Sequence, residues 1–438
     1  MMDFTTNNER RQVSVEEENG MGKLPEHVMD SILERLPLQD IIRTSILSKK
    51  WRYKWTTMKA VVFDEQISNK LAENGAFGRH GFTRVINQVL LLHKGSSISK
   101  FYLYIPNMFL DSFQEVDQWI FFLSTKGVED LTIANSIQLY QLPSCLFSCL
   151  ELRKLELGKC IFKPPLQFEG FPYLESLTLN NIDFTTTDVV INLPHLTKLI
   201  LRYCTNVYNL KIKATKLLNL VVIGCPDVMF LELLHSQRVG FLCARLQKPV
   251  KDFVRLERMN LALMFTKMPY LVRLFIDAHF LKDFIAEKRK WFPHTVNFLK
   301  CLRLYSFSPG DLDHLYGGLC LLRNSPNLEE LHVIHIKTES ELMHHGVEAT
   351  SNHLESPNCL DQTLNRLRTV QLSHLQGSKP ELLFIKLLLA HSPSLEKFTI
   401  QSDGTWDANK RFNITKDVMR FPRASSKAEL IYLDPKML

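Results

Sequence analysis

The sequence has no run of about 18 consecutive apolar residues, so it predicts no membrane-spanning helix. Its first residues, MMDFTTNNERR, contain no apolar core, so we expect no secretory signal peptide. Strong charge of one sign is also missing, because the formal net charge is only +7 over 438 residues. A mild basic excess does not by itself indicate nucleic-acid binding. We therefore expect a protein of the nucleus, the cytoplasm or both, with neither membrane nor nucleic acid as its partner.

Catalytic and metal-binding motifs are missing too. The chain contains no Gly-rich phosphate loop, no GxSxG and no HExxH, so we expect no enzyme and no catalytic residues. Its nine cysteines are scattered and odd in number, which indicates reduced thiols in a chain without a secretory signal. Cys145 and Cys149 are four residues apart, but no second pair of ligands follows them. We therefore expect no metal site and no cofactor.

Two clusters allow more than one interpretation. Histidines gather around residues 332–353, where a metal site or a pH switch is conceivable. No carboxylate spacing suited to a metal accompanies them, which favours a polar insertion in which histidine is common. Basic residues gather at 49–54 among tryptophans, a composition that nucleic-acid-binding segments also have.

Residues 24–58 hold two short amphipathic helical patterns divided by Leu36-Pro37. In the first pattern, apolar residues including Val28 and Ile32 recur on one helical face. Pro37 is expected to end that helix, and Asp40 can cap the second one. A segment of about 35 residues cannot bury this much apolar surface alone, so part of it must face the rest of the chain or a partner.

The wording LPxxxxxxILxxLPxxDxxxxSxLSKxW resembles the plant form of the F-box. The resemblance implies that the module binds a Skp-family adaptor and, through it, a cullin–RING ligase. It also accounts for the basic run, as the exposed side of the last F-box helix. The residues implied to face the adaptor are Leu24, Pro25, Val28, Ile32, Leu33, Leu36, Pro37, Ile41, Leu47 and Trp51.

A second pattern, L-x-x-L-x-L followed by an apolar residue or cysteine, returns along the chain and resembles the leucine-rich repeat. The clearest copies begin at Leu152, Leu174, Leu196 and Leu217, which are 21 to 22 residues apart. Each copy predicts one short strand whose leucines point inward and stack on the next copy. After residue 260 the copies are 28 to 39 residues apart, which predicts helices or insertions on the convex side. Weaker copies begin at Ile98, Val128, Val239, Leu271, Leu299, Leu328, Leu367 and Leu395.

The C-terminal phrase FPRASS with Ala428 resembles the FBD unit of plant F-box/leucine-rich-repeat proteins. We expect it to continue and cap the solenoid, with a helix over 381–391 and a last strand over 428–433. The predicted fold is therefore α/β: a helical F-box module, a leucine-rich-repeat solenoid or horseshoe, and an FBD cap. The expected divisions are a disordered tail at 1–20, the F-box at 21–62, a helical connector at 63–97, repeats at 98–360 and the FBD at 361–438.

Members of the family that this order resembles are substrate receptors of SCF (Skp–cullin–F-box) ubiquitin ligases. The resemblance implies that the repeats bind a target protein for ubiquitination, and the sequence does not name that target. The alternative is a repeat scaffold or small-molecule sensor whose F-box serves another assembly. Alternation along the strands places the expected target-binding residues on the concave surface, where binding hot spots favour arginine and aromatic side chains. These residues are Lys198, Ile200, Arg202, Arg273, Phe275, Arg303 and Tyr305.

Overall fold

The structure is a computed structural model, and it divides into two compact units, Met1–Glu129 and Asp130–Leu438. The finer division expected from the sequence stays a prediction. None of the helices in the described ranges combines the length and the apolarity that crossing a bilayer requires. The described residues are 24–33, 35–36, 40–41, 44, 51, 53–73, 78–106, 113–135, 138–184, 190–207, 210–225, 238–245, 261–278, 280–281, 296–335, 344–357, 359–360, 363–404 and 406–434.

The first unit begins with helix α1 (Glu26–Leu33), which starts directly after Pro25 and ends before Pro37. The carbonyl oxygen of Pro25 accepts the first backbone hydrogen bonds of the helix. A short 3₁₀ helix (Lys54–Thr57) lies against α1, and Lys54 Nζ is 3.1 Å from a carboxylate oxygen of Asp30. Lys54 is therefore paired within the module. Pro37 and most of the second helical pattern lie outside the described residues.

In the described part of the first unit, two parallel strands and three further helices follow. Strand β1 (Ala60–Phe63) pairs in parallel with β2 (Lys100–Ile105), and the rings of Phe63 and Phe101 meet at 6.2 Å. The helices are α3 (Glu65–Glu73), α4 (Gly78–Leu92) and α5 (Gln114–Ser124). Trp119 on α5 donates from Nε1 to Oδ1 of Asn87 on α4 at 2.6 Å, which holds these two helices together.

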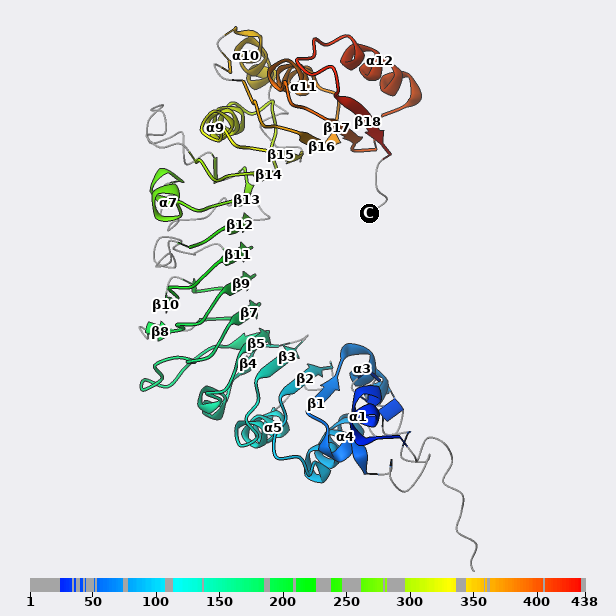
Figure 1. Cartoon of the computed structure of the whole chain (residues 1–438), viewed down its shortest axis with the longest axis vertical. Coiled ribbons are helices and arrows are strands. Elements are labelled where there is room, and N and C mark those ends of the chain that lie inside the picture. The colour runs from blue at the N-terminus through cyan, green and yellow to red at the C-terminus, as the bar shows by residue number, and fades with distance from the viewer. Residues whose placement is uncertain are drawn as a thin grey trace, which may run out of the picture. The chain divides into compact units, whose positions relative to one another are not determined.

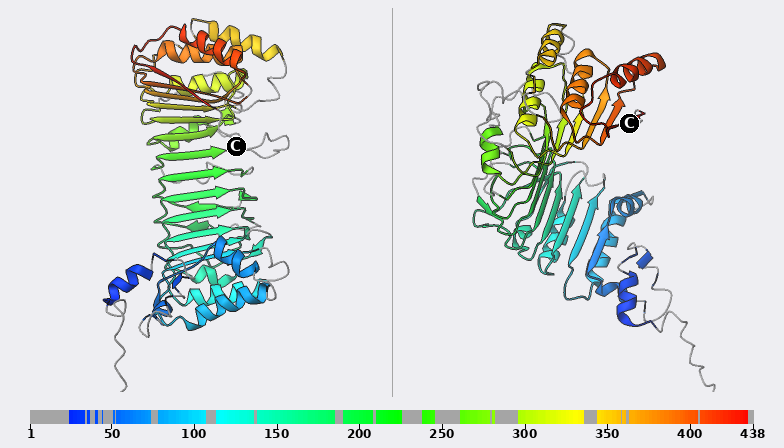
Figure 2. Two further views of the ribbon diagram at one scale, coloured as in Figure 1. Left: turned by 90° about the vertical axis from the view of Figure 1, so that its right-hand side faces the viewer. Right: turned by 45° about the horizontal axis from the view of Figure 1, so that its top comes forward.

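The second unit is organised by one parallel sheet with the strand order β3-β5-β7-β9-β11-β12-β13-β14-β15-β16-β17-β18. Its strands lie side by side like rungs in both views of Figure 2. The fold class expected from the repeats, a parallel α/β solenoid, is confirmed. The strand bounds are β3 Asp130–Asn135, β5 Lys154–Gly158, β7 Ser176–Asn180, β9 Lys198–Arg202, β11 Asn219–Ile223, β12 Phe241–Arg245, β13 Arg273–Asp277, β14 Cys301–Tyr305, β15 Glu330–Ile334, β16 Thr369–Leu375, β17 Lys397–Ser402 and β18 Glu429–Leu433.

The leucines of each repeat form continuous rows because the strands pair in register. Leu177 pairs with Leu155 on one side and with Leu199 on the other, and Leu199 pairs with Leu220. All four side chains are at most 3% exposed, so they form the core, as predicted. The residues that begin the eight weaker copies are also buried, at most 2% exposed, and each lies two residues before a strand: Ile98, Val128, Val239, Leu271, Leu299, Leu328, Leu367 and Leu395.

The convex side changes character along the second unit (Figure 1). The copies with the short period carry a 3₁₀ helix (Ser144–Ser148) and the small strands β4 (Tyr140–Gln141), β6 (Cys160–Ile161), β8 (Val190–Asn192) and β10 (Lys211–Lys213). The later copies carry helices α7 (Leu261–Lys267), α9 (Leu312–Arg323), α10 (His344–Glu355) and α11 (Lys379–His391). The prediction that wider spacing means convex helices is confirmed, and the polar segment 337–365 contributes α10.

The contacts of the C-terminal motif FPRASS explain why these residues are needed beside the last strands of the sheet. Ala424 donates its backbone N–H to Leu389 O of α11, and the buried hydroxyl of Ser425 donates to Leu395 O at 2.6 Å. The motif therefore anchors the chain that leads from α12 (Ala408–Met419) into β18. The helix expected over 381–391 is α11, and the expected last strand is β18, so both predictions are confirmed.

Candidate protein-interaction surfaces

The apolar side chains of the N-terminal module separate into an inner and an outer set. Met29 belongs to the inner set and is fully buried. Ile32 is 37% exposed, Pro25 is exposed, and Val28 is half-buried one turn before Ile32 on the same helix face. Leu24 and Leu36 are partly buried against the module's core. The outer set therefore presents apolar surface that the module itself does not cover.

Three residues implied to face the adaptor lie elsewhere. Leu33, Ile41 and Trp51 are 1%, 3% and 1% exposed and pack together with Met29 inside the module. We therefore reassign these three residues from the adaptor surface to the core of the module. So short a segment must use part of its apolar surface to stabilise its own fold. Pro37 and Leu47 lie outside the described residues.

The face of the sheet opposite to helices α7, α9, α10 and α11, which we call the concave face, carries the side chains that alternate with the leucines. Strand register aligns these side chains in rows that run across the strands. The central row is Glu156, Thr178, Ile200, Val221, Cys243, Phe275, Arg303, His332, Gln371 and Thr399.

Arginine and aromatic side chains interlock on strands β12 to β14 of this face. The guanidinium carbon of Arg303 lies 4.4 Å from the ring centre of Phe275, and that of Arg245 lies 3.9 Å from the ring centre of Tyr305. Stacking of this kind fixes the cation while its N–H edges stay able to bind an anion. We call the following set the arginine–aromatic patch: Phe241, Arg245, Arg273, Phe275, Arg303 and Tyr305.

The other residues expected to bind a target lie on β9. Lys198 is exposed and Arg202 is half-buried, on the same concave face as Arg273 and Arg303. Ile200 is only 7% exposed, so it forms part of the floor and offers little contact area. Asp277, two residues after Phe275 on β13, is 1% exposed and accepts a hydrogen bond from Ser306 Oγ at 3.2 Å, so it is a buried structural residue.

Sequence reasoning missed Phe241 and Arg245, which complete the patch. Arg273 stacks over Phe241 at 4.8 Å, and the rings of Phe241 and Phe275 meet edge to face at 5.0 Å. The signal was present, because the copy that begins at Val239 places a strand two residues later, and alternation then puts both residues on the concave face.

A second group of polar side chains lies beside the patch, on β14 and β15. His332 Nε2 is 3.8 Å from Glu330 Oε2, and Cys301 pairs with Glu330 across the two strands. Burial, followed by the charge of Glu330, raises the pKa of the Cys301 thiol to about 11. Burial, followed by the charge of Arg303, lowers the pKa of His332, which keeps its imidazole neutral near pH 7.

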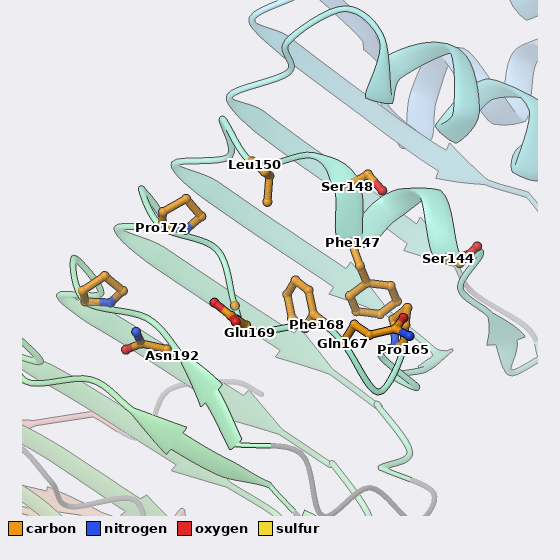
Figure 3. A pocket seen from close by; sticks show the side chains of 12 residues that line it. Ser144, Phe147, Ser148, Leu150, Pro165, Gln167, Phe168, Glu169, Pro172 and Asn192 are labelled. Atoms are coloured by element: carbon orange, nitrogen blue, oxygen red, sulfur yellow. The ribbon is translucent and has the colours of Figure 1, made fainter.

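The connections of the short repeats line an open pocket of about 510 Å³. Its walls are mostly apolar, and Figure 3 shows the rings of Phe147 and Phe168 side by side at its base. Gly170, in a left-handed conformation at φ 138°, is needed there because a Cβ would collide with the carbonyl oxygen of Asn192. The pocket uses no residue of the concave face that the sequence singled out.

The remaining candidate ligands have structural surroundings. All nine cysteines are free thiols, and burial, with the nearby Cys145, raises the pKa of Cys149 to about 12. His335 is buried beside Glu381, and the ring of His353 packs at a tilt against the ring of Tyr316, with 4.6 Å between the ring centres. The histidine-rich stretch therefore serves several separate environments in the described part of the chain. The side chains of His344 and His345 lie outside the described residues.

Comparison with known proteins agrees with this architecture. The F-box domain family matches residues 21–61, and the family described as At1g61320/AtMIF1, LRR domain, matches residues 89–422. The F-box/FBD/LRR-repeat protein At1g13570 of Arabidopsis thaliana is 34% identical over 415 residues, which is 94% of this chain and 97% of the relative. The Arabidopsis probable FBD-associated F-box protein At1g32375 is 23% identical over 94% of this chain and 99% of its own length.

This chain joins an F-box to a parallel solenoid of leucine-rich repeats, and it belongs to the plant F-box/FBD/LRR-repeat family. Proteins that combine these two domains are typical of SCF substrate receptors, and they are typically adaptors without catalysis. An F-box in general implies a Skp-family adaptor.

Proposed function

We propose that this protein is the substrate-recognition subunit of an SCF-type E3 ubiquitin ligase that acts in the nucleus, the cytoplasm or both. The F-box binds a Skp-family adaptor that leads to a cullin–RING ligase, and the concave face of the repeats binds a target protein. The subunit itself performs no chemistry. The observation that carries the proposal is that one chain joins an F-box with uncovered apolar residues to a repeat surface of stacked arginines.

The adaptor surface that we propose is the outer set of the N-terminal module: Leu24, Pro25, Val28, Ile32 and Leu36. Full burial of an isoleucine side chain is worth about 1.5–3 kcal/mol. Ile32 is 37% exposed, so an adaptor that covers it gains roughly 1 kcal/mol from this side chain. An aspartate at this position would instead require burial of a charge without a partner, which costs several times more.

The target surface that we propose is the arginine–aromatic patch together with Lys198 and Arg202 on β9. Its cations are held in fixed positions by stacking. Such a surface favours an extended acidic segment with apolar side chains, which contact the half-buried rings. A phosphorylated segment fits the same chemistry, because phosphate binds the planar fork of arginine in two places.

Adaptor binding is tested by co-elution of the purified chain with a Skp-family adaptor and a cullin. We expect Ile32→Asp to weaken adaptor binding at least tenfold, since a loss of about 1.4 kcal/mol already gives that factor. His27→Ala is the matched control, because His27 is exposed on the same helix. Equal affinity of the wild-type chain and Ile32→Asp would contradict this part of the proposal.

Target binding is tested by reversing two charges in the patch. Arg273→Glu with Arg303→Glu is expected to abolish target capture and leave adaptor binding unchanged. Arg153→Glu with Arg368→Glu makes the same change in net charge, at exposed arginines paired with Glu175 and Glu396. If both double variants lose the target equally, the effect comes from overall charge and the concave-face proposal is wrong.

One observation favours the second candidate function, a small-molecule sensor. The pocket at the connections of the short repeats has the size and the apolar lining of ligand sites. A ligand there would raise the melting temperature of the chain, and Gly170→Ala would remove the effect by displacing Asn192. If no molecule in a library of apolar small molecules causes such a shift, the sensor function is contradicted and the ligase proposal is the one that stands.

A further inference from the structure

Three side chains with the donor atoms of a transition-metal site converge on the concave face. The thiol of Cys301, the carboxylate of Glu330 and the imidazole of His332 place one ligand atom each within 4.8 Å of the others. The strands position them, since Cys301 pairs with Glu330 directly and His332 follows two residues later on the same face. We propose that these residues bind one divalent transition-metal ion, with Zn²⁺ as the best match.

The donor set decides the class of metal. Sulfur and imidazole nitrogen select zinc and its neighbours, whereas Mg²⁺ and Ca²⁺ need oxygen ligands throughout. Zinc bonds of about 2.0–2.3 Å in a tetrahedron set the donors roughly 3.3–3.7 Å apart. His332 Nε2 and Glu330 Oε2 are already 3.8 Å apart, so small side-chain rotations bring the set to binding distance.

The three proposed ligands differ in solvent exposure, from the floor of the concave face to its rim. Cys301 is 8% exposed, while the side chains of His332 and Glu330 are 20% and 54% exposed. Three protein ligands leave the fourth position of a tetrahedron open, and here it faces the concave surface. That position takes water, or a carboxylate or imidazole of a bound protein.

Polar side chains continue the row of His332 across the next strand. Its partner in the register of β15 and β16 is Gln371, which lies on the same face and donates from Nε2 to Ser373 Oγ at 3.4 Å. An amide beside a ligating imidazole can hydrogen-bond the ring nitrogen that does not hold the metal, which fixes the orientation of the ring.

The neighbouring arginines lower the affinity of the site for a metal cation, but their guanidinium groups do not occupy the site. The guanidinium of Arg303 lies over Phe275 on β13, and that of Arg273 lies over Phe241 on β12, both on the side of β14 away from β15. When the metal binds, the thiol of Cys301 loses its proton to solvent and the sulfur–metal bond forms. A thiolate and a carboxylate then balance the charge of the ion, and the arginines leave the site weaker than a structural zinc centre.

The test is titration of the purified, metal-free full-length protein with Co²⁺, whose thiolate complexes absorb by charge transfer in the near ultraviolet. We expect a band that saturates at one equivalent and disappears when Zn²⁺ is added. Cys301→Ser should abolish the band, and His332→Ala should weaken binding at least tenfold. Glu330→Gln changes only an exposed rim residue, so it tests the site without endangering the fold, and it should also weaken binding about tenfold.

Cys243 supplies the matched control, because it is another buried thiol on the concave face whose row neighbours are Val221 and Phe275. Cys243→Ser should retain the full band. The proposal is overturned if Co²⁺ gives no thiolate band, if the band survives Cys301→Ser, or if Cys243→Ser removes it. It is also overturned if Glu330→Gln binds Co²⁺ as tightly as the wild-type protein.

Discussion

Glu381 is the charged side chain whose removal gives the clearest test of the C-terminal part of the fold. It is 1% exposed, at the start of α11. Its carboxylate accepts the backbone N–H of Gln376 at 3.1 Å and that of Ser378 at 2.7 Å, and Ser378 caps the same helix in return. Oε1 also lies 3.6 Å from Nδ1 of His335, which is equally buried.

The cost of Glu381→Ala follows from these contacts. Two backbone donors lose a charged acceptor inside the protein, at about 1–3 kcal/mol for each group left without a partner. The two groups together give about 2–6 kcal/mol. His335 keeps the carbonyl oxygen of His374 as a partner of its Nδ1 at 3.2 Å. Glu381→Gln keeps one carbonyl oxygen as an acceptor and should therefore cost less than Glu381→Ala.

Urea unfolding combined with hydrogen exchange measures the effect. Because a solenoid transmits instability mainly to neighbouring repeats, exchange should quicken in α11 and in the strands beside it, and much less in β5 to β9. Glu396→Ala is the matched control, since the Glu396 side chain is 62% exposed and should cost less than about 0.5 kcal/mol. Equal losses from Glu381→Ala and Glu396→Ala would refute the reasoning.

Three further outcomes follow from the structure. Leu199→Ala should cost about 2–5 kcal/mol as a core cavity, with faster exchange in β7 and β11, and an equal change in β17 would contradict this. Gly224→Ala should cost about 1–3 kcal/mol, because the new Cβ meets the ring of Tyr203, and the cost should shrink in a Tyr203→Ala background. Burial, then Arg323, lowers the pKa of His353 in the folded state, so the unfolded chain takes up the proton first. Stability should therefore fall as the pH drops below about 6.5, and His353→Gln should flatten that slope in denaturant titrations.

The repeats could be predicted from the sequence because the leucines of each copy determine where its strand lies and which of its side chains face the core. Even a weak copy such as that at Val239 locates its strand correctly, since burial of the starting residue fixes which side chains face inward. The same holds for α11, whose capping box Ser378–Glu381 is a local signal that needs no tertiary information.

The surfaces could be predicted only in part. Alternation places Arg303 and Phe275 on the concave face, but their contact depends on the register between strands 28 residues apart in the chain. The cluster around Cys301 depends on register in the same way, because its ligands come from two strands, so no metal motif can be recognised in the sequence. In the F-box, periodicity marks Ile32 and Leu33 alike as apolar, and only packing shows that one is 37% and the other 1% exposed.

The central claim, that this chain delivers a target to a ligase, is tested most directly by the lifetime of the proteins that it holds. Plant cells would express the wild-type chain, Ile32→Asp, and Ile32→Asp combined with the double charge reversal at Arg273 and Arg303. We predict that Ile32→Asp accumulates a bound protein whose half-life is longer than in wild-type cells, and that the combined variant releases it. An unchanged half-life of every protein bound by Ile32→Asp would contradict the account.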